Sequence, residues 1–223
     1  MSMPSGRWTS SRTSLRSSKI SPTCLTPMTE PGLAPEAFRP LLGGPSVHAL
    51  RIELLDVEPM VWRRFVVPSD TKLPKFNRML ETVMGWEGYH LHMFEVADLR
   101  IGRPDEFSAD IIDERQLKLE QLLPRVGSRL QWSYGFGDGW EHAVAVEAIE
   151  APSPDVRYPI CAAGERACPP EDCGGVWGYE HLRAVVVDPA HPEHEHLRDW
   201  VGTGFDPDAF DQMAMTARLR RVR

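Results

Sequence analysis

Three of the four cysteines lie in a glycine- and proline-rich stretch, residues 158–179, with the spacing C-x6-C-x4-C. A loop of that composition can bring three thiolates around one cation. Structural zinc sites use four nitrogen or sulfur ligands, usually paired two to four residues apart. The candidate zinc ligands are therefore Cys161, Cys168, Cys173 and either His142 or His181. Cysteines that pack as small apolar side chains, or that form a redox pair, are the alternatives.

Histidines and carboxylates form a second candidate site. His90 and His92 stand two residues apart in an extended segment, so both point to one face. Metal-assisted hydrolysis uses carboxylates close to histidines. The candidate catalytic residues are His90, His92, Asp138, His142, Glu171 and Asp172. The structural alternative makes the three acids turn and loop residues and makes His92 a hydrogen-bonded core histidine.

The sequence lacks two common motifs, the phosphate-binding P-loop and the G-x-S-x-G motif of serine hydrolases. Residues 135–139 are glycine-rich, but they lack the Lys-Ser/Thr pair of a P-loop and precede a predicted strand. No G-x-S-x-G nucleophile motif occurs. Neither nucleotide hydrolysis by a P-loop nor serine hydrolysis of that type is expected.

Composition indicates a single globular domain with a tail. Of 223 residues, 42% are hydrophobic and 26% charged, near the globular average. Residues 1–45 carry five basic and two acidic side chains, so their net charge of +3 leaves −10 for residues 46–223. Such an acidic domain disfavours nucleic acid, and the expected partner is an unidentified protein. No apolar run reaches the roughly 18 residues of a membrane span, and we expect a cytoplasmic protein with reduced thiols.

The tail, residues 1–45, is rich in Ser, Arg and Pro and has no hydrophobic period, which predicts disorder. A transit peptide or an extension without function are the two interpretations of it. Residues 46–223 are predicted to form one domain.

The first half of this domain predicts strands at 47–55, 61–67, 90–97 and 99–102, with a helix at 73–84. Arg63 and Arg64 fall on opposite faces of the second strand, so at least one is solvated. A second hairpin is expected from 129–136 and 140–149 around a Gly-Asp-Gly turn. Helices are expected at 179–187 and 194–201, and Asp206 is predicted to cap a third, while residues 158–179 are expected to form no long element.

The predicted fold class is therefore α+β. A mostly antiparallel sheet of two hairpins carries one early helix, and a C-terminal group of helices packs on it. The strand–strand–helix–strand order at the start is compatible with a β-grasp-like beginning.

Together these segments resemble a bacterial family named after the third open reading frame of a root-inducing plasmid. The residues that carry the resemblance are 59–64 (PMVWRR), 84–86 (MGW), 90–92 (HLH), 134–142 (YGFGDGWEH), 158–179 and the Asp206-Pro207 ending. The resemblance covers residues 47–212 and implies an origin on mobile elements, because members are labelled insertion-element passengers of the TnpR type. Gly135 and Gly139 depart from the family pattern, which usually has Asp at the first and often at the second.

The first hypothesis for function is a non-enzymatic binding or accessory module of mobile-element origin with a structural, zinc-holding cysteine loop. The alternative is a metal-dependent hydrolase or nuclease-like enzyme that uses His90, His92, Asp138 and His142. DNA recombination is a weaker alternative that rests on the TnpR label. A serine resolvase needs an activated serine and a basic DNA-binding module, and the acidic domain shows neither.

Overall fold

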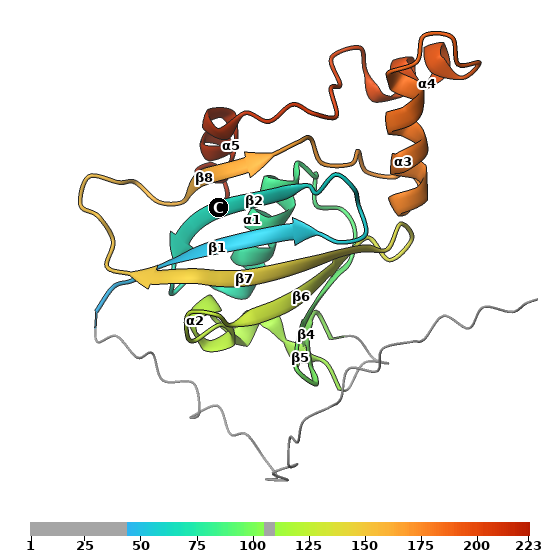
Figure 1. Ribbon diagram of the computed structural model, residues 1–223. Coiled ribbons are helices and arrows are strands. Elements are labelled where there is room, and N and C mark those ends of the chain that lie inside the picture. The colour runs from blue at the N-terminus through green and yellow to red at the C-terminus, as the bar shows by residue number, and fades with distance from the viewer. Residues whose placement is uncertain (1–43, 105–109) are drawn as a thin grey trace, which may run out of the picture. The chain divides into compact units, whose positions relative to one another are not determined.

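The computed structural model describes residues 44–104 and 110–223, all within a compact unit that spans residues 35–223 (Figure 1). The predicted disordered tail falls almost entirely on residues outside these ranges. The described residues form an α+β fold with a mixed, mostly antiparallel sheet of eight strands in the order β5-β4-β3-β6-β7-β1-β2-β8. Three of the five α-helices follow the last strand. None of the helices in these ranges has the length and apolar character to cross a membrane.

The strands are β1 (Val47–Leu54), β2 (Trp62–Pro68), β3 (His92–Val96), β4 (Leu99–Gly102), β5 (Ile112–Asp113), β6 (Arg129–Tyr134), β7 (Trp140–Glu150) and β8 (Ile160–Glu165). Both predicted hairpins are confirmed as β1–β2 and β6–β7, and β1 also pairs with β7, which joins them into one sheet. The helices are α1 (Leu73–Met84), α2 (Leu119–Leu122), α3 (Gly175–Val186), α4 (His194–Val201) and α5 (Gln212–Leu219). A 3-10 turn, η2 (Glu114–Gln116), follows β5.

Helix α1 covers one face of the sheet, and the predicted bounds 73–84 are confirmed. Its apolar side chains pack against inward-facing residues of β1, β2 and β6 in a single core. The helix ends at Gly85, whose φ of 85° suits glycine. Alternation along β2 buries Arg63 and leaves Arg64 half-exposed and paired with Glu147, so the prediction that one of the two arginines is solvated is confirmed.

Several elements differ from the sequence prediction. Strand β3 begins at His92 rather than at residue 90, helix α3 begins at Gly175 rather than at residue 179, and the two-residue strand β5 was not predicted. Strand β8 lies within the stretch expected to form no long element, because antiparallel pairing with β2 supplies backbone partners that its weak propensity does not reveal. Helix α5 is capped by Asp211, whose Oδ1 accepts the N–H of Ala214 at 2.9 Å. The predicted cap, Asp206, instead accepts the N–H of Asp208 in a turn that precedes the helix.

The C-terminal helices do not form one layer. Helix α5 packs on β8 and α1, whereas α3 and α4 contact each other. Figure 1 shows α3 and α4 beyond one end of the sheet. The segment between β8 and α3 therefore crosses that end of the sheet. Residues 167–174 of this segment, which we call the 167–174 loop, contact the segment between α1 and β3.

Candidate functional site

A pocket lies between α1 and the chain that enters β3, and we call it the α1–β3 pocket. Its volume is about 470 Å³. It is lined by Asn77, Glu81, Gly88, Tyr89, His90, Leu91, His92, Met93, Arg100, Arg103, Pro104, Ile111 and Phe136. Acidic, basic, aromatic and aliphatic side chains thus face one space, a mixture typical of sites for polar ligands.

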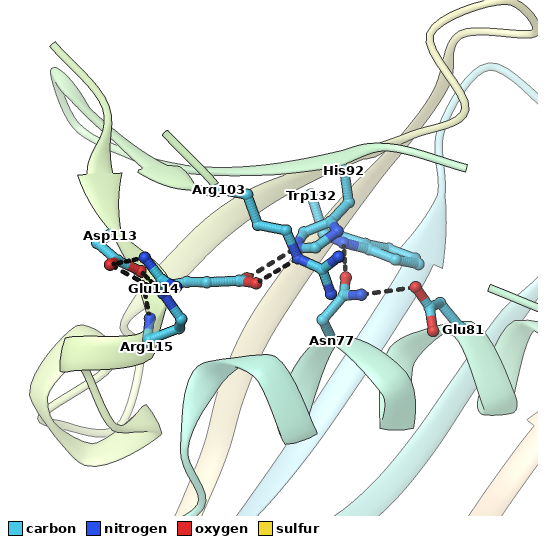
Figure 2. Close-up of polar contacts among 8 residues, drawn as sticks. All are labelled: Asn77, Glu81, His92, Arg103, Asp113, Glu114, Arg115 and Trp132. Carbon is cyan, nitrogen blue, oxygen red and sulfur yellow. Dashed lines mark hydrogen bonds and ion pairs between the residues drawn. The ribbon is translucent and has the colours of Figure 1, made fainter. Parts of the chain in front are cut away.

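A chain of hydrogen bonds holds the carboxyl of Glu81 in this pocket (Figure 2). The indole Nε1–H of Trp132 donates to Oδ1 of Asn77 at 3.0 Å, and Nδ2 of Asn77 donates to Oε1 of Glu81 at 2.6 Å. The indole can only donate, so it fixes the orientation of the Asn77 amide. Gly88 has a φ of 81°, and a Cβ there would stand 2.5 Å from Oε2 of Glu81, so glycine lets the backbone approach the carboxyl.

The buried position of Glu81 changes its acidity. Its exposed fraction is only 7%, and burial raises its pKa. The hydrogen bond from Asn77 and the charges of His92, Arg78 and Arg103 offset part of this effect. Glu81 therefore holds a proton more readily than an ordinary glutamate does.

A second buried carboxyl, Glu114, has the opposite shift. Its Oε2 lies 2.7 Å from Nε2 of His92 and its Oε1 accepts from Nε of Arg103 at 3.2 Å. Burial opposes ionisation of Glu114, but the hydrogen bonds and charges of His92 and Arg103 outweigh it, and the pKa is lowered. Figure 2 shows Glu114 and Glu81 on opposite sides of His92. This region therefore contains two buried carboxyls with opposite pKa shifts: the pKa of Glu81 is raised, and that of Glu114 is lowered.

We expect the Glu81→Gln variant to gain stability over the wild type as pH rises. The folded pKa of Glu81 is raised above its ordinary value of 4.5, so its contribution is fully present below pH 4.5 and is lost as pH rises through the folded pKa. Glutamine keeps the acceptor for Asn77 and does not titrate. Urea unfolding at a series of pH values from 4 to 9 measures the difference.

The matched control is Glu147→Gln, for which the opposite sign is expected. The hydrogen bond from Arg64 lowers the pKa of Glu147, so its contribution is present above pH 4.5 and is lost as pH falls. This pair is partly exposed, so the loss should stay below ~1 kcal/mol. Two variants with the same pH dependence would contradict the assignment of the shift to Glu81.

The rim of the α1–β3 pocket is joined to the 167–174 loop. Nε2 of His90 lies 3.2 Å from Oδ1 of Asp172. The hydroxyl of Tyr134 donates to Oε1 of Glu171 at 2.5 Å, and the N–H of Glu87 donates to its Oε2 at 3.0 Å. Four of the six predicted site residues, His90, His92, Glu171 and Asp172, therefore lie in or beside one region, although only the two histidines line the pocket.

His142 and Asp138 lie elsewhere. His142 is fully buried in an aromatic cluster formed by Trp86, Trp132, Tyr134, Trp140 and His142 itself. Its Nδ1 lies 3.0 Å from the carbonyl oxygen of Trp132, which must accept, so this nitrogen carries the hydrogen. Burial lowers the pKa of His142 to about 3, so the ring is neutral. Asp138 is in the β6–β7 turn, where its backbone lies against Gly175, and neither residue lines the α1–β3 pocket.

The three cysteines in the described part of the chain are free thiols held by separate contacts. Cys161 lies on β8, Sγ of Cys168 accepts from Nη2 of Arg63 at 3.1 Å, and burial raises the pKa of Cys173 to about 12. His181 is exposed and pairs with Glu193 at 3.0 Å. Within residues 44–104 and 110–223, no group of three or more His, Cys, Asp or Glu side chains has a metal-holding arrangement.

The sequence prediction missed the polar residues on the wall formed by α1. Asn77 and Glu81 are spaced i, i+4 on α1 and are buried beside its apolar residues, and two polar residues next to an apolar face are a signal of a buried polar site. Glu114 and Arg103 had no such signal, because they come from a segment that looks like an ordinary polar loop.

Comparison with known proteins identifies the family. The model of the plasmid pRiA4b ORF-3-like protein family matches residues 46–214. The chain is 38% identical over 160 residues to a Sinorhizobium fredii protein described as uncharacterized protein y4hQ, which covers 71% of this chain and 82% of that protein. A crystal structure of a protein of unknown function from Methanosarcina mazei Go1 is similar with a TM-score of 0.70 and 35% identity, over 76% of this chain and 97% of the other. The chain therefore belongs to the plasmid pRiA4b ORF-3-like family.

Proposed function

We propose that the protein is a binding module for a small polar molecule, which the α1–β3 pocket holds. The observation that carries this proposal is the buried carboxyl of Glu81 on the wall of the pocket, fixed by Asn77 and Trp132. A buried carboxyl costs stability unless it is fully paired. Binding sites retain such groups because a ligand uses them.

The polar groups of the pocket define what the ligand must offer. Glu81 supplies a carboxyl, His90 and His92 supply imidazoles, and Arg100 and Arg103 supply guanidinium groups. A ligand that matches them carries hydrogen-bond donors at one end and an acidic group at the other. The proposal includes an accessory role on mobile elements, because the matching family takes its name from a plasmid reading frame.

Acid–base catalysis is the second candidate function. Two carboxyls with pKa values displaced in opposite directions are typical of acid–base pairs. Here Glu81 would hold the proton, and Glu114 would orient His92. This catalytic hypothesis differs from the one based on the sequence, which used His90, His92, Asp138 and His142. Asp138 and His142 do not line the pocket.

Comparing the small molecules that the wild type and the Glu81→Gln variant release tests the binding function. Both proteins, and Glu147→Gln as a folded control on the opposite face of the sheet, are purified from the same cells, denatured and analysed by mass spectrometry. We expect one compound from the wild type and the control, and at least ~10-fold less from Glu81→Gln, because the amide cannot reproduce the carboxyl's hydrogen bonds to the ligand and leaves a buried polar group of the ligand unpaired. The same compounds in equal amounts from all three proteins, or none from any of them, would refute the proposal.

A further inference from the structure

We infer that the ligand of the α1–β3 pocket is a free mononucleotide, an inference that rests on the proposed function. A mononucleotide needs three things from a protein: a surface for the flat base, hydrogen-bonding groups for its edge, and cations for its phosphate. The pocket presents all three from different elements, and its volume of about 470 Å³ falls in the range of small-ligand sites.

Two exposed aromatic rings supply the flat surface. Tyr89 and Phe136 are 63% and 58% exposed, and both line the pocket although they lie on different loops. Gly135, next to Phe136, donates its N–H to the carbonyl oxygen of Leu91 at 2.9 Å, which ties these two loops together. The fold does not bury either ring. Exposed aromatic side chains can stack on a base whichever base it is, because every base has a π-face.

Two arginines supply the cations. Arg100 lies on β4 and Arg103 just after it, and their side chains are 49% and 68% exposed. Arg103 uses Nε for Glu114. Arg100 pairs with Asp110 at 3.2 Å and with Glu95 at 3.8 Å. A guanidinium has five N–H donors, so within residues 44–104 and 110–223 each arginine has donors beyond these pairs for phosphate oxygens.

Two buried side chains that line the pocket, Glu81 and His92, supply hydrogen-bonding groups for the edge of the base. Glu81 is fixed by Asn77, and His92 is fixed by Glu114, so both enter the pocket with defined orientations. A carboxyl accepts from the amino or imino groups of a base, and a protonated one also donates. Fixed polar groups of this kind give orientation to a ring that stacking alone leaves free to rotate.

Isothermal titration with the four nucleoside monophosphates tests the inference on the full-length protein. We expect at least one of them to bind one to one, and its nucleoside and inorganic phosphate each to bind at least ~10-fold more weakly. If inorganic phosphate binds as tightly as the nucleoside monophosphate, the pocket binds anions and does not recognise the nucleoside. Equal or tighter binding of a single-stranded trinucleotide would make the ligand a nucleic acid. Each of these results, or binding of no monophosphate, overturns the inference.

The variants separate the roles of the rings and the arginines. Tyr89→Ala and Phe136→Ala should each weaken nucleotide and nucleoside binding by about tenfold, the usual cost of one lost base stack. Arg100→Ala should weaken nucleotide binding by a similar factor and leave nucleoside binding unchanged. Trp177→Ala is the control, because Trp177 is 84% exposed and does not line the pocket. If the wild type releases a compound that depends on Glu81 but no monophosphate binds, the inference fails and the binding function stands.

Discussion

Replacing Arg63 with methionine is expected to lower the free energy of unfolding by at least ~3 kcal/mol, because four buried or partly buried carbonyl groups lose this donor. The buried guanidinium donates to the carbonyl oxygens of Val83 at 3.2 Å, Trp62 at 2.7 Å, Glu165 at 2.6 Å and Arg166 at 2.6 Å, and to Sγ of Cys168 at 3.1 Å. The ring of Phe210 covers it, with Cζ 4.4 Å from the ring centre. One side chain thus joins β2, the end of α1 and the chain that follows β8.

Arg64→Met is the matched control, since the two arginines are neighbours in the same strand. The side chain of Arg64 is 41% exposed and pairs with Glu147, so its loss should cost less than ~1 kcal/mol. Thermal unfolding measures both variants, and about 3 kcal/mol corresponds to roughly 6–12 °C for a domain of this size. Equal midpoints for the two variants would show that Arg63 does not hold these elements together.

Replacing Trp86 with alanine is expected to cost ~3–5 kcal/mol, the range for a large aromatic side chain in a packed core. Trp86 is 4% exposed, and its ring stacks on Tyr134 with centroids 4.6 Å apart and planes 9° apart. Its indole N–H donates to the carbonyl oxygen of Pro169 at 2.9 Å. The variant therefore loses the centre of the aromatic cluster and one attachment of the 167–174 loop.

Trp177→Ala removes the same side chain from an exposed position on α3 and should change stability by no more than ~0.5 kcal/mol. Urea unfolding followed by circular dichroism compares the two variants without relying on tryptophan fluorescence. A loss below ~1 kcal/mol for Trp86→Ala would mean that the cluster is loosely packed.

Elements that depend on local sequence were predictable. The alternation of β1 and β2 and the helical spacing of α1 directly reflect which side chains are buried, so hydrophobic periodicity identifies them. Strand β8 was not predictable, because its pairing with β2 involves residues about 100 positions apart and its sequence, ICAAGE, has no strong strand preference.

The candidate site was predictable only in part, for a similar reason. His90 and His92 were predicted to lie together, and both line the pocket, but the predicted reason was wrong, because β3 begins at His92 and His90 lies in the preceding loop. Which carboxyls join them depends on sheet order: β3 pairs with β4 on one side and β6 on the other, which brings the segment of Glu114 to His92. His142 faces the core from β7, in the aromatic cluster, and no spacing rule reveals that separation.

The most direct test of the binding function is the indole N–H spectrum of the protein, recorded by two-dimensional ¹H–¹⁵N NMR. The chain has seven tryptophans, and the indole of Trp132 donates to Asn77, which holds Glu81. The probe is the small-molecule fraction of an extract from the cells that produce the protein, and Trp132→Phe assigns the signal. We predict that the Trp132 signal shifts while those of Trp62 and Trp177 stay in place, and that Glu81→Gln abolishes the shift. An unchanged Trp132 signal, or a shift that persists in Glu81→Gln, would contradict a ligand site at Glu81.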